Sequence, residues 1–192
     1  MSDEEFFSYK LPGVTTILSE IFGQEEFANI PKHVLDNAAK RGSAVHKYIE
    51  DFINNGYFTN IDLEYQIYID YFNDWLYKYK PCFVFSEKKL VSEKLGYKGI
   101  IDTVFIENNN ELVMCDWKTS SNLNTFKAKC QLNLYLLLLE EAFPKYKNKI
   151  NKLKILSLTK SGFKYYEFKP DRELAKATLL IYKEKTKNVW DN

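Results

Sequence analysis

The sequence predicts an α/β fold of the α+β kind, in which one mixed β-sheet is flanked by helices. The first part of the chain has helical periodicity, the middle changes to short runs rich in Val, Ile and Phe, and one helix separates these runs from a final hairpin. At 192 residues, 45% hydrophobic and 16% aromatic, the chain fills one substantial core but is short for two domains. We expect a single domain over 1–192, with a helical part at about 1–81, a sheet core at about 82–170 and a final helix at 171–188.

Three helices are expected in the N-terminal part. A short helix covers 12–22 after a Pro-Gly pair, and a longer one covers 31–56, where Pro31 suits a helix start and Gly56 a helix end. The aromatic-rich stretch 62–81 is a third helix, which its final proline closes.

After residue 81 the spacing of the apolar residues changes from that of helices to that of strands. Three runs, 83–93, 97–107 and 111–119, are separated by a Leu-Gly pair at 95–96 and by three asparagines at 108–110. Such spacing is typical of antiparallel hairpins. A helix over 123–143 follows.

The last part of the chain repeats this change of period once. Strands at 152–159 and 163–169 form a further hairpin, and Asp171 caps a helix over 171–188. The order of helices, three strands, helix, two strands and helix favours one mixed sheet with helices packed against it.

Composition narrows the class of protein. The 27 basic and 26 acidic residues nearly cancel, so a nucleic-acid partner would have to meet a local patch rather than a basic molecule. The three cysteines form no CxxC pair, which disfavours an iron–sulfur cluster or zinc ribbon and fits a reducing compartment. The acidic start is not a secretory signal, and the longest apolar run, 134–139, is too short to cross a membrane. We expect a soluble intracellular protein.

An acid and an amine end the third strand. Asp116 and Lys118 are two residues apart, so they share the face of the strand that also carries Leu112 and Met114. On the preceding strand, Asp102 stands among apolar residues, where a carboxylate is costly unless it is paired or binds a metal. If the two strands form a hairpin, both carboxylates reach one edge of the sheet, and oxygen ligands of this kind suit Mg²⁺ or Mn²⁺.

These residues resemble a known signature. The stretches 98-KGIIDTVF-105 and 115-CDWKTS-120 are similar to the D…DxK form of the PD-(D/E)xK nuclease motif. With 131-QLNLY-135 downstream and 41-RGSAVHKYIE-50 upstream, the chain resembles the RecB-type exonuclease domain, a group with phage and mitochondrial members. The resemblance covers 41–135 and implies a restriction-endonuclease-like core preceded by helices.

The resemblance implies a metal site for one or two Mg²⁺ or Mn²⁺ ions. Its expected ligands are His46, Asp102, Asp116 and the backbone carbonyl of Trp117, with Glu87 as a further candidate. The cysteine set of the iron–sulfur members is missing from this chain.

The resemblance also implies roles around that site. Lys118 would be the catalytic lysine, acting together with the aspartates, while Gln131 and Tyr135 would line the site and contact DNA from one helix face. Arg41 would contact phosphate or cap a carbonyl. Glu50, four residues after the histidine, would either hydrogen-bond to the imidazole from outside the metal site or be a solvated helix residue.

Simpler interpretations stand beside these. His46 could only join helices, and Gln131 and Tyr135 could be packing residues. The lysine-rich run 145–154 is either a solvated surface or a guide for the nucleic-acid backbone. Four aromatic residues near the start either stack single-stranded bases or belong to the core: Phe6, Phe7, Tyr9 and Phe22.

The sequence therefore predicts a metal-dependent DNA exonuclease that acts on single strands or free ends, in replication, repair, recombination or phage DNA metabolism. Replication or recombination proteins are its expected protein partners, and no membrane is expected. Two alternatives stay open: an endonuclease of the same fold, and a nucleic-acid-binding subunit without activity.

Overall fold

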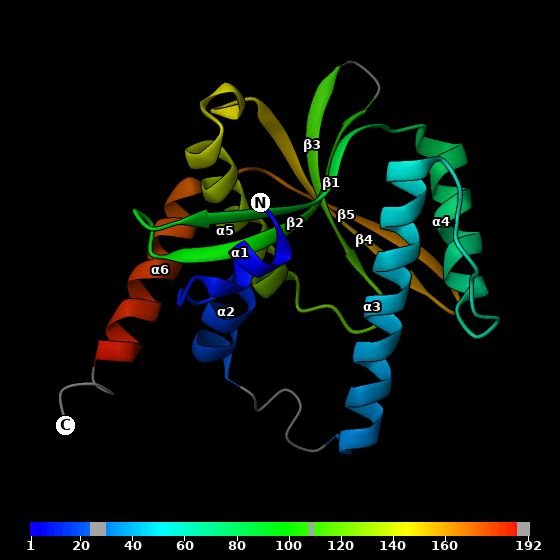
Figure 1. The fold of residues 1–192 in the computed structure, drawn as a ribbon, viewed down its shortest axis with the longest axis horizontal. Coiled ribbons are helices and arrows are strands. Elements are labelled where there is room, and N and C mark those ends of the chain that lie inside the picture. Colours follow the sequence, from blue (N-terminus) through cyan, green and yellow to red (C-terminus); the bar gives the residue numbers. More distant parts are fainter. Residues whose placement is uncertain (24–29, 108–109, 188–192) are drawn as a thin grey trace.

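The computed structural model describes residues 1–23, 30–107 and 110–187, which form a five-stranded sheet covered by helices on both faces (Figure 1). The helices are α1 (Asp3–Ser8), α2 (Val14–Phe22), α3 (Lys32–Asn55), α4 (Gln66–Tyr79), α5 (Thr125–Ala142), the 3₁₀ turn η2 (Pro144–Tyr146) and α6 (Arg172–Lys187). The strands are β1 (Cys82–Ser92), β2 (Tyr97–Glu107), β3 (Glu111–Lys118), β4 (Ile150–Thr159) and β5 (Gly162–Phe168).

The sheet is mixed, as the sequence predicts. Its strands lie in the order β1-β2-β3-β4-β5, and only the β3–β4 pair is parallel. A parallel pair needs a crossover between its strands, and α5 supplies it. The predicted hairpins 83–107, 97–119 and 152–169 are thereby confirmed.

Each face of the sheet has its own core. On one face, α2, α5 and α6 pack against Met114, Ile101 and Ile155. On the other face, α3 and α4 cover Trp117 and Phe105. Because neighbouring residues of β3 point to opposite faces, the side of Met114 continues along the strand to Asp116 and Lys118.

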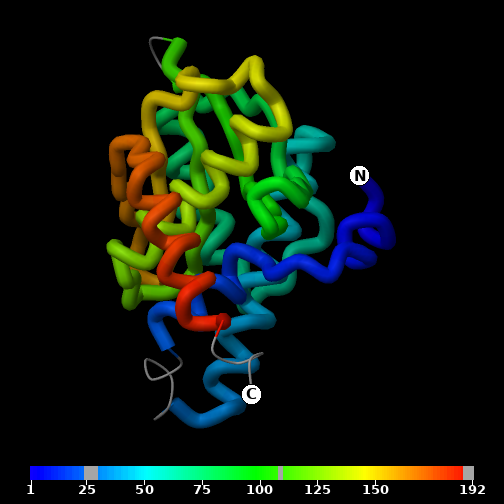
Figure 2. The backbone as a smooth tube through the Cα atoms, turned by 90° about the vertical axis from the view of Figure 1, so that its left-hand side faces the viewer, coloured from blue at the N-terminus to red at the C-terminus, as the bar shows by residue number. Residues whose placement is uncertain are grey.

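The structure adds one helix and shortens another. The short α1 (Asp3–Ser8) begins at Ser2, whose hydroxyl accepts a hydrogen bond from the backbone N–H of Glu5 at 3.2 Å. The third predicted helix begins at Gln66 rather than at 62. In Figure 2 the N-terminal segment (blue) runs from α1, which projects at the right of the view, to α2, which lies beside α6 (red). No helix of the described residues combines the length and apolar character needed to span a bilayer.

Candidate active site

Three adjacent strands bring their carboxylates to one place. Glu87 lies in β1, Asp102 in β2 and Asp116 in β3, and His46 faces them from the middle of α3. The β1–β2 register pairs residues 86 with 103 and 88 with 101, which sets Glu87 beside Asp102. The sheet therefore collects acids that are far apart in sequence, together with one imidazole.

His46 is held in the centre of this group. Its Nε2 donates a hydrogen bond to the backbone carbonyl of Trp117 at 2.9 Å. The other nitrogen, Nδ1, is 3.5 Å from Asp102 Oδ2 and 3.7 Å from Glu87 Oε1. The Trp117 carbonyl, an expected metal ligand, thus accepts a hydrogen bond from the imidazole in this structure.

Asp102 is fixed by the backbone of the neighbouring strand. The residue is 7% exposed, and its Oδ2 accepts a hydrogen bond from the N–H of Trp117 at 2.7 Å. This bond ties the β2 carboxylate to the strand that carries Asp116 and Lys118, so the hairpin itself sets the spacing of the two acids.

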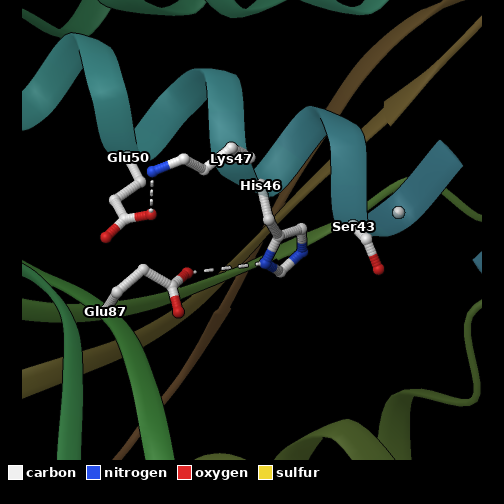
Figure 3. A pocket seen from close by; sticks show the side chains of 6 residues that line it. Ser43, His46, Lys47, Glu50 and Glu87 are labelled. Carbon is white, nitrogen blue, oxygen red and sulfur yellow. Dashed lines mark hydrogen bonds and ion pairs between the residues drawn. The ribbon is translucent and has the colours of Figure 1, made fainter. Parts of the chain in front are cut away.

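Glu87 has an unusual backbone. Its φ of 45° lies in the left-handed region, which a residue other than glycine in a strand seldom adopts. Such a conformation costs about 1 kcal/mol or more and is found most often where the site needs the direction it gives the side chain. Figure 3 shows the carboxylate of Glu87 facing the His46 ring across a hollow of about 430 Å³.

Asp116 is the most buried of the three acids, at 2% exposure. Its Oδ1 accepts a hydrogen bond from Gln131 Nε2 at 2.9 Å, and its Oδ2 lies 2.6 Å from Lys118 Nζ. Despite that ion pair, Oδ2 accepts no hydrogen bond of good geometry from the described residues. A buried carboxylate oxygen in this condition retains capacity for a cationic ligand.

Gln131 and Tyr135 support Asp116 from α5. Gln131 Nε2 is also 3.2 Å from Tyr135 Oη, and both side chains are more than nine-tenths buried. They line the same cavity as Asp116, but their hydrogen bonds are to the protein. We interpret them as positioning residues for the carboxylate, and the expected contact with DNA stays a prediction.

Gly99 makes room for this support. A Cβ at position 99 would lie 2.7 Å from Cε1 of Tyr135 and 3.1 Å from Val14. The tyrosine ring therefore lies directly on the glycine backbone of β2, which the KGIID resemblance gave no reason to expect.

Two cations, His46 and Lys118, offset part of the negative charge of the three acids. Burial by itself lowers the pKa of His46, but Asp102 and Glu87 outweigh it and raise the pKa from 6.5 to about 9. Burial, then the Asp116 charge, raises the pKa of Asp102 above its ordinary range. Burial opposes the charge of Lys118 as well, yet Asp116 and Asp102 hold its pKa above the usual value. The carboxylates thus attract positive charge strongly.

For Glu50 and Arg41 the sequence left two alternatives each, and the structure contradicts one of each; a contact of Arg41 with phosphate stays a prediction. Glu50 does not bond to His46: its Oε2 is 3.2 Å from Lys47 Nζ, and both imidazole nitrogens face other groups (Figure 3). A residue four positions along a helix reaches its neighbour only when that side chain turns along the helix, and His46 turns toward the sheet.

Arg41 lies outside the cavity that contains the acids. Its Nε donates to Thr119 Oγ1 at 3.3 Å, and it lines a separate hollow with Tyr68 and Lys160. The hydrogen bond joins α3 to the residue after Lys118, so Arg41 supports the end of β3 rather than capping a carbonyl.

The sequence profile of the PD-(D/E)XK nuclease superfamily matches residues 63–189. The chain belongs to this superfamily. The match includes Asp102, Asp116 and Lys118 and leaves His46 outside it. A search of curated proteins finds no match.

Solved nuclease structures share the fold. A protein named as an exonuclease from Eubacterium rectale is 12% identical, with a TM-score of 0.54 over 98% of this chain and 85% of its own. An alkaline exonuclease from Laribacter hongkongensis is 6% identical, with a TM-score of 0.52 over 97% of this chain and 92% of its own. At such identities the likeness concerns the fold.

The residues present fit the divalent metal ion that the superfamily uses. Donor atoms of His46, Glu87 and Asp102 all lie within 4.8 Å of one another, and carboxylate with imidazole suits Mg²⁺ or Mn²⁺. Oδ2 of Asp116, which accepts no hydrogen bond of good geometry from the described residues, is a further oxygen near this group that a cation would satisfy.

Proposed function

We propose that the protein is a metal-dependent deoxyribonuclease of the RecB type that removes nucleotides from the ends of single-stranded DNA. The observation that carries the proposal is the buried Asp116, which has an unbonded oxygen beside Lys118 and faces the same cavity as Asp102. A cavity of about 560 Å³ contains both acids and the lysine and is large enough for part of a nucleotide strand.

The residues divide the work of hydrolysis. His46, Glu87, Asp102 and Asp116 would hold one or two Mg²⁺ or Mn²⁺ ions, which supply an activated water and stabilise charge on the phosphate. Lys118 orients the attacking water and steadies the charge that develops on the scissile phosphate. Gln131 holds Asp116 through Oδ1, which leaves its other oxygen, Oδ2, beside Lys118.

An exonuclease is preferred to the alternatives on two grounds. The two similar solved structures carry the name exonuclease, and the acids, the imidazole and the lysine are all retained. A binding subunit without activity would have no need for a strained Glu87 facing the imidazole. A role in DNA replication, repair or recombination forms part of the proposal.

The test is a cleavage assay with three substrates. Purified protein is incubated with end-labelled linear single-stranded, linear duplex and circular single-stranded DNA, in Mg²⁺, Mn²⁺ or chelator. We expect linear single strands to be degraded with either metal and circles to survive.

The other possible outcomes of this assay would change or overturn the proposal. Cleavage of circles would replace the exonuclease with an endonuclease of the same fold. If pure protein cleaves nothing with either metal, and Asp116→Asn behaves as the wild type does, the enzymatic proposal is wrong.

A further inference from the structure

The cavity that contains the catalytic acids has a second wall, built by the N-terminal segment. Phe6, Phe7 and the residues 11–16 line it together with Asp116 and Lys118. None of these N-terminal residues falls within the part of the chain that matches the superfamily profile. This wall therefore needs a separate explanation.

Lys98 fixes the N-terminal segment to the sheet. Its Nζ donates to the backbone carbonyls of Tyr9 at 2.7 Å and Phe6 at 3.1 Å. Its backbone N–H donates to Pro12 O at 3.0 Å, where Gly13 forms a bridge to the end of β2. The wall is thus held by the strand that, four residues later, carries Asp102.

The two aromatic residues of α1 differ in exposure. Phe6 is 4% exposed and anchors the helix, whereas Phe7 is 67% exposed although it lines the cavity. Their rings meet edge to face with centroids 5.3 Å apart, and Lys98 Nζ lies 4.9 Å from the Phe6 centroid and 5.8 Å from that of Phe7. Phe7 is therefore a braced aromatic ring with a free surface.

We propose that Phe7 stacks against a base of the bound strand, at one of the two nucleotides that flank the scissile phosphate. This inference rests on the proposed nuclease function and adds the group that positions the strand. An exposed aromatic ring beside a phosphate-cleaving site suits the flat face that all four bases share, so it selects no sequence. The phosphate would lie at Lys118 and the metal ions that the acids hold, and the apolar wall contacts the base.

The chemistry of the wall favours a nucleobase over a second phosphate. Lys98, the cation nearest to the rings, already donates to two carbonyls of α1. The wall around Phe7 is apolar, through Phe6, Leu11, Pro12 and Val14, and its two hydroxyl side chains, Thr15 and Thr16, lie farther along the chain. Apolar surface stabilises a base but not an anion. Unpaired single strands expose their bases to such a surface.

The test combines a protein change with a substrate change. Cleavage is measured for wild type and Phe7→Ala on a linear single strand, and again on strands with an abasic residue at either flanking nucleotide. Loss of one stacked base should lower kcat/KM about tenfold for Phe7→Ala. For the wild type, kcat/KM should fall by the same factor on the abasic strand. For Phe7→Ala it should fall less than about twofold on that strand, because the partner ring is already gone.

Two further variants separate stacking from folding. Phe7→Trp should keep kcat/KM within about twofold of wild type, while Phe7→Leu, which keeps apolar volume without an aromatic face, should resemble Phe7→Ala. Tyr77→Ala is the matched control, because Tyr77 is an 83% exposed aromatic residue on α4 that does not line this cavity. It should be neutral.

A binding measurement distinguishes failure of this inference from failure of the proposed function. A strand with 2-aminopurine at a terminal nucleotide is titrated in chelator, where no turnover occurs, and quenching reports stacking. We expect quenching with wild type and not with Phe7→Ala, even if the wild type cleaves nothing. Any of three results would overturn the stacking role. The abasic strand could lower kcat/KM equally for wild type and Phe7→Ala, Phe7→Leu could cleave as fast as wild type, or wild type and Phe7→Ala could quench equally.

Discussion

Two buried charged clusters lie on the same sheet, and they are built in opposite ways. In the first, Lys154 of β4 donates to both oxygens of Glu107 at 2.7 and 2.8 Å, and Tyr165 Oη donates to the same carboxylate at 2.8 Å. Lys154 also lies 4.4 Å from the centre of the Tyr165 ring. The buried anion is fully satisfied here, and the cation also lies 3.3 Å from the half-exposed Glu167.

In the second cluster, the carboxylates have more acceptor oxygens and more negative charge than the neighbouring groups satisfy. Glu87, Asp102 and Asp116 meet around His46 and Lys118, and an oxygen of Asp116 has no hydrogen bond from the described residues. A satisfied buried pair serves the fold, whereas a group with spare acceptors and excess negative charge is suited to a ligand. The contrast predicts that changes in one cluster alter stability and changes in the other alter activity.

The largest expected effect is on catalysis. Asp116→Asn or Lys118→Met should lower the cleavage rate about a thousandfold, because each removes a charge that acts on the reacting phosphate. The free energy of unfolding should change by about 1 kcal/mol or less, since the loss of the ion pair is offset by weaker repulsion from Asp102. A cleavage assay measures the loss of rate, and urea unfolding in chelator measures the change in unfolding free energy. An unfolded Asp116→Asn protein would contradict the contrast.

The reverse pattern is expected at Lys154. Lys154→Met leaves the Glu107 carboxylate buried without its cation and should cost about 3 kcal/mol of unfolding free energy. The cleavage rate of the folded fraction should stay within about twofold of wild type, because the cluster lies outside the cavity of the acids. Glu107→Gln combined with Lys154→Met should recover most of the stability. Lost activity at unchanged stability would show that the clusters are not independent.

The third prediction concerns pH. The pKa of His46 is raised to about 9 from 6.5, so its proton stabilises the folded, metal-free protein fully below pH 6.5, and this stabilisation disappears as the pH rises through 9. With the ring partly exposed, we expect a loss of about 1–2 kcal/mol over this window. Urea unfolding in chelator at several pH values measures it, and His46→Gln should remove that part of the slope.

Metal binding should show the matching trend. A metal ion competes with the proton on His46, so the stabilisation by Mn²⁺ should increase from pH 6.5 to 9. A stabilisation independent of pH would show that His46 gives up no proton when the metal binds.

The sequence could predict the acids of the second cluster because their placement depends on short-range features. A hairpin between 97–107 and 111–119 is enough to bring Asp102 beside Asp116, and the period of two assigns Lys118 to the same face. His46 could be predicted as a member of the cluster only through the resemblance of its RGxxxH segment to the nuclease family.

The first cluster could not be predicted in this way. Lys154 and Glu107 lie on strands that are separated by β3, so their meeting depends on the strand order and the parallel register. The contact of Gly99 with Tyr135 depends likewise on how α5 crosses the sheet. The helix α1, by contrast, could have been predicted from local sequence, because Ser2 is a suitable N-cap and acidic residues follow it.

The smallest effect comes from comparing two glutamates that both lie near His46. Glu87 reaches the imidazole from β1, at 3.7 Å, with a strained backbone, whereas Glu50 pairs with Lys47 on the exposed side of α3. Glu87→Gln keeps the size of the side chain but removes a charge from the cluster, and should lower the cleavage rate about tenfold or more at limiting Mg²⁺.

Glu50→Gln is the matched control and should change the rate by less than about twofold, because the helix-surface pair that it breaks contributes about 0.5 kcal/mol at most. Rates are compared over a range of Mg²⁺ concentrations, since excess metal should rescue a weakened ligand. If both variants lose activity equally, the charge near His46 matters in general, and the direction that the strained backbone gives to Glu87 does not. If only Glu87→Gln is impaired and Mg²⁺ restores it, Glu87 belongs to the metal site.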